Sequence, residues 1–437
     1  MTHDTATILG GDCSKVNSSA DLESRLHRQL CYARRNSRYY RDRIPEEVVQ
    51  SPAGLRHFDS IMMTSKAEVI ADQQREPPFG SGLACDPAEL RRIFLSADLI
   101  LPMTGEDLRT LVTLYASGWR QVGVGPGDIA DVSSTYHLAL GGTIQDDGFR
   151  EAGAAVLPGG PGRSAHRLQL LRSLRVTVLQ AFTPYAEQLA AAGPEAGVDP
   201  ATELAVRLLV VGGELRDTAS KQRLSALWGS ARIVEVYGAS EAGLVAIDCP
   251  EVANGMHVLD GSLVEIVDPV SGLPADAASG GEIVLTDLFR QAQPWIRCRT
   301  GDIVESVTTE PCPCGLTTPR LGRIIGRTGH ILRVRGTFVD VNRIAALVAE
   351  AGAAPISVEV QRPAGGTDEV TIRVAIDGQA TDEQARSAEE LIRRSVFEMI
   401  GVRCSVAFQP GAHTAGLTII DGRQESVPAS GVAQPAE

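Results

Sequence analysis

A hydroxyl and a carboxylate stand side by side at Ser240 and Glu241, inside the stretch EVYGASEAG of residues 235–243. The apolar run ARIV, residues 231–234, comes just before it, and glycines follow at positions 238 and 243. This pattern predicts a buried strand that ends in a glycine turn. The turn would present both side chains together, and a carboxylate is a good ligand for a hard cation. The sequence therefore raises the question of what these two side chains hold.

Three thiols and an imidazole form a second candidate group. Cys249 and His257 lie in the segment CPEVANGMH, and Cys312 and Cys314 lie in the segment CPC. A set of three cysteines and one histidine suits a closed, tetrahedral Zn²⁺ site, and a site with four protein ligands is structural and not catalytic. The spacing is not that of a standard zinc finger, so buried thiols and a surface histidine are the alternative. We expect structural zinc.

Composition limits the class of protein. The chain has 437 residues, of which 43% are hydrophobic and 22% charged, and its formal net charge is -13. It has no Lys/Arg-rich run, so we expect neither nucleic acid nor a membrane surface as a partner. No segment approaches the roughly 18 apolar residues of a membrane helix, and the N-terminal residues do not resemble a signal peptide. Eight cysteines spread over this length indicate reduced thiols or a metal site. We expect a cytoplasmic protein.

Two regions differ in their pattern of elements. From about residue 20 to 325, apolar strands such as 208–211 and 232–236 alternate with helical segments such as 217–228, which is typical of an α/β fold. Beyond residue 326 the pattern predicts a small α+β unit with helices at 341–350 and 382–400 and strands at 356–361, 369–376 and 403–408. We therefore expect a large domain over residues 1–326, a small domain over 327–423 and a disordered tail over 424–437.

Several motifs in colinear order give the chain a family resemblance. YGASE at 237–241, RTGD at 299–302 and Gly326-Arg327 are similar to motifs of the adenylate-forming (ANL) superfamily of acyl-CoA synthetases and ligases. Further segments resemble the phenylacetate-CoA ligase branch, namely residues 31–41, 211–214, 292–302, 312–315 and 326–336. The resemblance covers nearly the whole chain. It implies a large, multi-sheet N-terminal domain that binds acyl and nucleotide groups, followed by a small α+β domain.

The resemblance also implies roles for single residues. Tyr237 would stack on adenine, Ser240 would contact phosphate and Glu241 would bind Mg²⁺. Asp302 would accept hydrogen bonds from the ribose hydroxyls, and Arg327 would lie near the nucleotide. Some members of the branch are similar at the Cys/His set and carry structural zinc. The alternative is that Tyr237 and Glu241 are inherited scaffold without a ligand.

The chain departs from the family where phosphate and carboxylate charge would be stabilised. The expected glycine-rich phosphate loop is replaced by SADLILP at 96–102, which has no glycine and contains Asp98; it reads as an apolar strand or turn. No lysine follows Lys221, although the family uses one near the C-terminus. Gly329 and His330 stand at the hinge, where the family has acidic residues. Each lost group is commonly worth roughly 3–4 kcal/mol of barrier, so the sequence argues against ATP, AMP and Mg²⁺ as cofactors.

The acyl pocket of the family would lie between residues 133–142, 211–214 and 237–239. The candidate pocket residues are Tyr136, His137, Gly141, Gly212, Gly213, Gly238 and Ala239. The candidate catalytic residues are His137, Glu241, Cys298 and His330. His137 is a general acid or base candidate because its ordinary pKa lies near neutrality. The alternatives are a histidine in the pocket wall and, for Cys298, an inert buried thiol.

Three functions follow from this sequence. The first is an enzyme that takes an activated acyl donor, such as a CoA thioester or an acyl group on a carrier protein, and performs transfer, condensation or cyclisation without adenylation. The second is an ATP-dependent ligase that forms a CoA thioester or an amide through an altered phosphate site. The third is a non-catalytic protein that binds a small carboxylic acid or acyl ligand. We expect the first, and a homodimer is one candidate oligomeric state.

Overall fold

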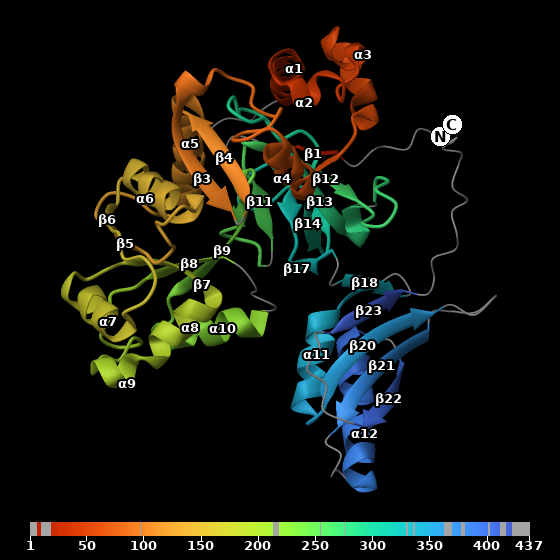
Figure 1. The fold of residues 1–437 in the computed structure, drawn as a ribbon. Coiled ribbons are helices and arrows are strands. Elements are labelled where there is room, and N and C mark those ends of the chain that lie inside the picture. The colour runs from red at the N-terminus through yellow and green to blue at the C-terminus, as the bar shows by residue number, and fades with distance from the viewer. Residues whose placement is uncertain are drawn as a thin grey trace, which may run out of the picture. The chain divides into compact units, whose positions relative to one another are not determined.

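The chain divides into two compact units, Met1–Ile324 and Ile325–Glu437. The computed structural model describes residues 7–9, 19–96, 98–212, 218–253, 255–275, 277–328, 331–334, 337–361, 369–376, 381–400, 403–410 and 417–421. Figure 1 shows the order of the elements along the chain. The predicted tail at 424–437 lies outside the described residues.

A nine-stranded sheet with the order β15-β16-β11-β10-β9-β8-β7-β5-β6 forms the centre of the first unit. Its parallel part consists of β5 (Ile129–Val132), β6 (Ala155–Leu157), β7 (Val178–Phe182), β8 (Leu208–Gly212) and β9 (Arg232–Ala239). Its antiparallel part consists of β10 (Gly243–Asp248), β11 (Met256–Val258), β15 (Val307–Thr308) and β16 (Arg320–Leu321). Strand β8 is buried almost throughout, as its apolar sequence LLVV predicts for a parallel strand covered on both faces. The predicted α/β class is confirmed.

Helices connect and cover these strands. They are α4 (Lys66–Arg75), α5 (Gly105–Gln121), α6 (Leu140–Ala152), α7 (Ser164–Ser173), α8 (Thr183–Ala191), α9 (Gly193–Ala196) and α10 (Thr218–Leu227). One apolar core gathers Trp119, Phe149 and the inward side chains of β5 and β8. A second core lies under α7, α8 and α10 and contains Trp228. These cores hold the parallel strands in place. The carboxyl ends of such strands are where α/β proteins commonly bind ligands.

A second sheet completes the first unit. Within that unit it has the order β1-β12-β13-β14, and β2 pairs with β14. Its strands are β1 (Thr7–Leu9), β2 (Thr64–Ser65), β12 (Ser262–Val267), β13 (Gly281–Asp287) and β14 (Cys298–Val304). Strand β17 (Ile324–Arg327) begins at the last residue of the first unit and continues into the second. The N-terminal helices α1 (Ser19–Asn36), α2 (Arg38–Arg41) and α3 (Glu46–Val49) lie between β1 and β2 in the chain, and the hairpin strands β3 (Leu90–Ser96) and β4 (Leu99–Thr104) follow β2. Short 3₁₀ turns occupy Pro52–Ser60, Pro87–Glu89 and Ala277–Ser279.

The second unit contains a four-stranded sheet in the order β22-β21-β20-β23. Its elements are β18 (Ile331–Val334), β19 (Thr337–Asp340), α11 (Val341–Glu350), β20 (Ala354–Gln361), β21 (Glu369–Ile376), α12 (Asp382–Ile400), β22 (Cys404–Pro410) and β23 (Thr418–Asp421). Helices α11 and α12 contact each other and pack on this sheet (Figure 1). The predicted helices at 341–350 and 382–400 are confirmed, whereas the hairpin β18–β19 and the edge strand β23 were not predicted.

Across the ranges given above, no helix combines the length and the apolar character that crossing a membrane requires.

Candidate functional site

Strands β9 and β10 form the hairpin that presents Ser240 and Glu241. Gly243 pairs with Ala239, and the amide of Ala242 donates to the carbonyl of Ala239 over 3.0 Å. Gly243 has a φ of 79°, a conformation that glycine adopts without strain. The predicted strand with a glycine turn at its end is therefore confirmed.

Glu241 forms an ion pair with a lysine. The carboxylate is fully buried, and its Oε2 lies 3.0 Å from Nζ of Lys66. No well-formed hydrogen bond reaches either of its oxygens from the other described residues. Lys66 is the first residue of α4, whose start is fixed by reciprocal hydrogen bonds between Ser65 and Glu68. Sequence reasoning missed this partner, because nothing in the motifs links Lys66 to Glu241.

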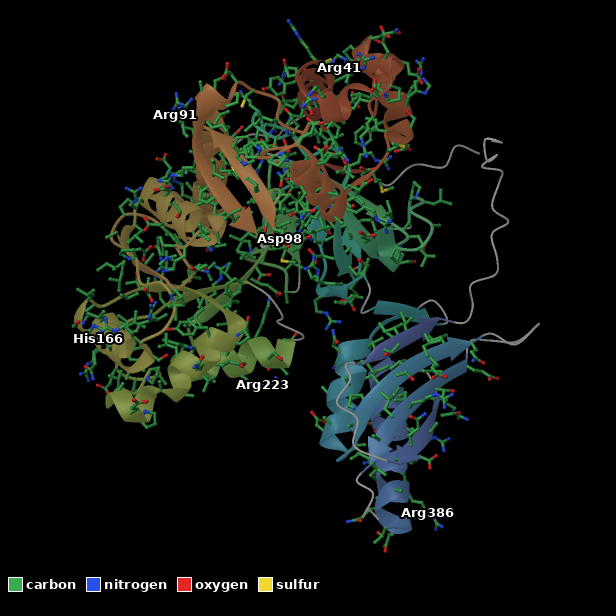
Figure 2. The ribbon with its side chains drawn as sticks, viewed as in Figure 1. Arg41, Arg91, Asp98, His166, Arg223 and Arg386 are labelled. Atoms are coloured by element: carbon green, nitrogen blue, oxygen red, sulfur yellow. The ribbon has the colours of Figure 1, made fainter. Side chains whose placement is uncertain are left out.

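The hydroxyl of Ser240 contacts the hydroxyl of another serine. Its Oγ lies 2.8 Å from Oγ of Ser96, the last residue of β3. Strands β3 and β4 pair as an antiparallel hairpin, so residues 96–102 contain the predicted strand and turn, while the loss of a phosphate loop stays a prediction. Asp98 lies exposed at the tip of this hairpin, where Figure 2 labels it. Ser96 therefore contacts Ser240, and the carboxylate of Asp98 stands two positions further along the chain.

Tyr237 and Asp302 are brought together. The phenol of Tyr237 donates to Oδ2 of Asp302 over 3.0 Å, and Tyr237 is 6% exposed. Burial raises the pKa of this phenol well above its ordinary value, and the neighbouring carboxylate of Asp302 adds to the shift. The tyrosine is therefore a neutral donor. Arg327 is the last residue of β17 and belongs to the second unit, and its predicted place near the nucleotide stays a prediction.

The predicted pocket segments lie at the carboxyl ends of the parallel strands. Tyr136 donates to Asp146 over 3.0 Å, and Gly212 ends β8. Gly238 has no room for a side chain, because an added Cβ would lie 2.9 Å from the carbonyl oxygen of Gly243. Ala239 is buried, and Gly141 belongs to the first turn of α6. Gly213 lies outside the described residues. A shared pocket for these residues stays a prediction.

The candidate catalytic residues differ in their accessibility. His137 is exposed, and its backbone amide donates to Oγ1 of Thr135. Cys298 is fully buried, and burial raises its thiol pKa well above the ordinary value, with the nearby Glu241 carboxylate adding to the shift. A thiolate is disfavoured there, which favours the inert alternative for Cys298. His330 lies outside the described residues. A catalytic role for any of these residues stays a prediction.

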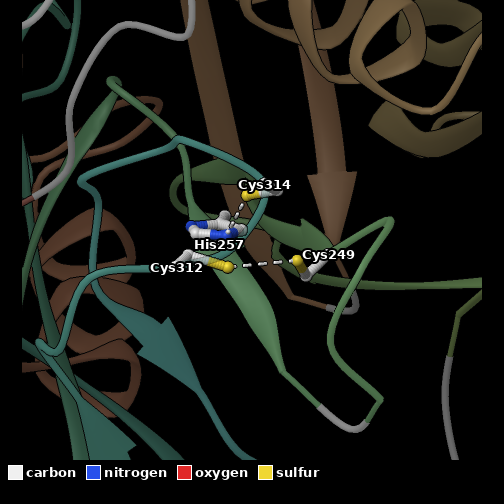
Figure 3. A group of neighbouring side chains, drawn as sticks. All are labelled: Cys249, His257, Cys312 and Cys314. Carbon is white, nitrogen blue, oxygen red and sulfur yellow. Dashed lines mark hydrogen bonds between the residues drawn. The ribbon is translucent and has the colours of Figure 1, made fainter.

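Cys249, His257, Cys312 and Cys314 converge on one point (Figure 3). Their ligand atoms all lie within 4.8 Å of one another. The two sulfurs of Cys249 and Cys312 are 3.4 Å apart, and Sγ of Cys314 is 3.2 Å from Nε2 of His257. Tetrahedral Zn²⁺ with bonds of about 2.0–2.3 Å places its ligand atoms about 3.5–3.8 Å apart. These two separations lie within a few tenths of an ångström of that range, and three thiols and one imidazole are donor types that suit Zn²⁺.

Thr318 orients the histidine of this cluster. Nδ1 of His257 lies 3.1 Å from the carbonyl oxygen and 2.9 Å from Oγ1 of Thr318. A proton on Nδ1 that is donated to the carbonyl leaves the lone pair of Nε2 facing the sulfurs. Burial lowers the pKa of His257, which keeps the imidazole in the neutral form that coordinates metal. Sequence reasoning missed Thr318, because a single threonine carries no motif.

A buried ion cluster ties the far end of the β9–β10 hairpin to α10. Nζ of Lys221 lies 2.8 Å from Oδ2 of Asp248 and 3.3 Å from Oε2 of Glu235. The backbone amide of Glu235 also donates to Asp248 over 2.8 Å. Asp248 directly precedes Cys249, so these ion pairs connect the Cys/His cluster to the strand that carries Tyr237.

Comparisons with known proteins agree with this fold. Residues 149–287 match the family model described as AMP-binding enzyme. The chain is 29% identical to the phenylacetate-coenzyme A ligase of Thermus thermophilus over 415 residues, which cover 89% of this chain and 91% of that protein. It is 26% identical to the phenylacetate-coenzyme A ligase of Aromatoleum evansii over 316 residues, with 70% of each chain covered.

A solved structure extends the likeness to three dimensions. The open conformation of a 2-hydroxyisobutyryl-CoA ligase, in complex with 2-HIB-AMP and CoA, aligns with a TM-score of 0.78 at 23% identity and covers 91% of this chain and 90% of its own. The protein therefore has the fold of the adenylate-forming enzymes, and its sequence is similar to those of AMP-binding enzymes and phenylacetate-coenzyme A ligases.

Proposed function

We propose that the protein acts on a carboxylic acid in its activated form, as a CoA or carrier-protein thioester, and transfers the acyl group without forming an acyl adenylate from ATP. One observation carries this proposal. The hydroxyl and the carboxylate that the resemblance assigns to phosphate and Mg²⁺ are each engaged by a partner from the first unit, Ser96 for Ser240 and Lys66 for Glu241.

The β3–β4 hairpin supports this view of the phosphate site. Phosphate-binding loops rely on glycines, whose backbone amides approach the anion closely. Here Ser96 is bonded to Ser240, and the next described residue is the carboxylate-bearing Asp98. A negative charge at this position opposes a polyphosphate by Coulomb repulsion. A thioester needs no such loop, because its acyl carbon is already activated.

The proposed reaction conserves atoms without a further co-reactant. A nucleophile that bears a proton attacks the acyl carbon of the thioester, a new bond to carbon forms, and the carbon–sulfur bond breaks. The proton of the nucleophile ends on the released thiol. His137, which is exposed, is the candidate group for carrying that proton.

An ATP-dependent acid–CoA ligase is the second candidate function. It is favoured by the Tyr237–Asp302 hydrogen bond, which brings together the two residues that the resemblance assigns to adenine and ribose. The likeness to a phenylacetate-coenzyme A ligase over 89% of the chain also favours it. In this case Lys66 would lie beside the nucleotide site as a positive charge supplied by the N-terminal part of the chain.

We also propose that Cys249, His257, Cys312 and Cys314 hold a structural Zn²⁺. The convergence of four ligand atoms and the orientation of His257 by Thr318 support this assignment. When bound, zinc would supply a cross-link between β10–β11 and the segment that precedes β16. It has no open position for substrate, so it takes no part in acyl transfer.

The first experiment compares two sets of substrates with the same protein. Phenylacetate, ATP and CoA are tested for pyrophosphate release, and phenylacetyl-CoA with hydroxylamine as the nucleophile is tested for release of free CoA thiol without ATP. Isothermal titration with ATP, AMP and CoA accompanies both assays. We expect thiol release without ATP and no nucleotide binding at millimolar concentration. Pyrophosphate release that depends on the acid would overturn this proposal in favour of the ligase.

A variant and its control connect this activity to the site. His137→Ala is expected to lower kcat for thiol release by at least about tenfold if its imidazole carries the proton. His166→Ala, an exposed histidine on α7, is the matched control and leaves kcat unchanged. Equal kcat values for the two variants would remove His137 from the mechanism.

A further inference from the structure

Glu241 is the only carboxylate to which the resemblance gives a metal, and its surroundings differ from those of a metal ligand. It is fully buried, and its nearest charged neighbour is the ammonium of Lys66, 3.0 Å from Oε2. Mg²⁺ requires oxygen ligands at about 2.0–2.1 Å in octahedral geometry and usually keeps several waters. The fully buried carboxylate of Glu241 has no exposed oxygen for a hydrated ion, and the ammonium beside it repels a second cation.

Neighbouring acidic groups do not supply the missing ligands. Asp302 accepts the Tyr237 hydroxyl, and Glu282 is paired with Arg299. Among the residues that the structure describes, ligand side chains gather in a group of three or more only at the Cys/His cluster, which does not include Glu241. The residues present therefore do not fit the Mg²⁺ that the family implies.

We propose that Lys66 is the permanent counter-ion of Glu241 and that its ammonium replaces the divalent cation at this site. This inference deepens the proposed function and rests on the same site. It explains why the carboxylate is kept although the phosphate loop is not: a buried carboxylate needs a cation, and the chain provides one. It also predicts that the nucleotide end of the site does not bind divalent metal.

The position of Lys66 is built into the fold. Ser65 pairs with Arg299 where β2 joins β14, and it also caps α4. Lys66 is therefore held between a strand and a helix start, and only its side chain is free to move. An ammonium is a compact charge with three donors, whereas a guanidinium is a wide planar fork, so the two groups are not interchangeable. This accounts for a lysine here in a chain whose lysines are Lys15, Lys66 and Lys221.

The inference is tested with Mn²⁺ as the probe. Binding is followed by electron paramagnetic resonance on the zinc-loaded full chain, with Mn²⁺ alone and with Mn²⁺ plus ATP. We expect wild type and Glu241→Gln to bind Mn²⁺ identically, because Lys66 already occupies the carboxylate. Weaker binding by Glu241→Gln than by wild type would overturn the inference. This comparison does not require Lys66 to be changed.

A gain of binding provides the second test. Lys66→Met removes the competing positive charge, and like charges at one site suppress affinity by at least about tenfold. We expect Lys66→Met to bind Mn²⁺ at least about tenfold more tightly than wild type, and Lys66→Met/Glu241→Gln to lose that gain. A folded Lys66→Met protein without the gain would overturn the inference. Because no acyl group is involved, this result is independent of whether the acyl-transfer proposal holds.

Discussion

Thr318 shows how a residue that is not itself a candidate ligand can orient one. It contacts His257 through both its carbonyl and its hydroxyl, and the imidazole is fully buried. Groups that fix the tautomer and the direction of a histidine ligand are commonly worth about 10–100-fold in metal affinity. The side-chain hydroxyl is the part of this contact that a substitution can remove.

Thr318→Val is therefore expected to weaken Zn²⁺ binding by about tenfold or more while the fold is retained. The affinity is measured by competition with a chromophoric chelator, and Co²⁺ absorption reports the ligand geometry. Thr317→Val, at the preceding position, is the control and keeps wild-type affinity. Equal affinities for both variants would limit the role of Thr318 to packing.

Asp287 is expected to make the free energy of unfolding depend on pH. It is fully buried, and burial raises its pKa to about 7, an effect that Arg290 and backbone amides only partly offset. In the unfolded chain its pKa is about 4. Between about pH 4 and pH 7 the folded protein keeps a proton that the unfolded chain has released, so the free energy of unfolding falls as pH rises through this window.

Asp287→Asn is expected to flatten that slope, because the amide does not titrate. The measurement is urea unfolding at several pH values between 4 and 8, and the quantity compared is the slope and not the absolute stability. Asp42→Asn, at an exposed position, serves as the control and retains the wild-type slope. A slope unchanged in Asp287→Asn would mean that other groups cause the pH dependence.

At the scale of elements, the β9–β10 hairpin connects the two candidate sites. Its turn carries Ser240 and Glu241, and its other end carries the Lys221 cluster and leads into Cys249. Breaking a buried ion pair from one side leaves charges without compensation and is strongly destabilising. Because two carboxylates share Lys221, removal of its ammonium would leave both of them without that counter-ion.

Lys221→Met is accordingly expected to lower the free energy of unfolding by up to about 3 kcal/mol, a value reduced for the partial exposure of the lysine. Arg223→Met, an exposed position on the same helix, is the matched control and changes it by less than about 0.5 kcal/mol. Urea unfolding of the first unit measures both. Similar values for the two variants would show that Lys221 is a surface charge of little consequence.

The sequence predicted the helices and strands better than it predicted the contacts between distant residues. Apolar periodicity predicted β8, β9, α11 and α12, since a period of two or 3.6 residues is local information. The Cys/His set was predicted because its residue types are rare, and the structure brings them together. The contact of Ser240 with Ser96 joins residues 144 positions apart, and Lys66 is likewise remote from Glu241. Such contacts depend on the packing of whole strands, which no local pattern contains.

For the whole molecule, the proposed zinc would close a long loop in the first unit and have no ligand in the second. Its ligands come from the β10–β11 region and from residues 312–314, all within residues 1–324, while the second unit has a core of its own. A metal that binds the folded protein but not the unfolded chain adds its binding free energy to the stability of the unit that contains it. Removing the metal should therefore lower one unfolding transition and not the other.

We expect a chelator to lower the unfolding temperature of the first unit by at least about 5 °C and to leave that of residues 325–437 unchanged, as measured by differential scanning calorimetry. Cys249→Ser should reproduce the shift without chelator and reduce the zinc content well below one atom per chain. Cys85→Ser, which removes a thiol of the same unit outside the cluster, should keep both the zinc and the unfolding temperature. Equal shifts of both transitions would place the metal elsewhere, and full zinc in Cys249→Ser would exclude that cysteine as a ligand. Because neither measurement involves a substrate, the structural role of the metal is tested separately from the chemistry of the acyl site.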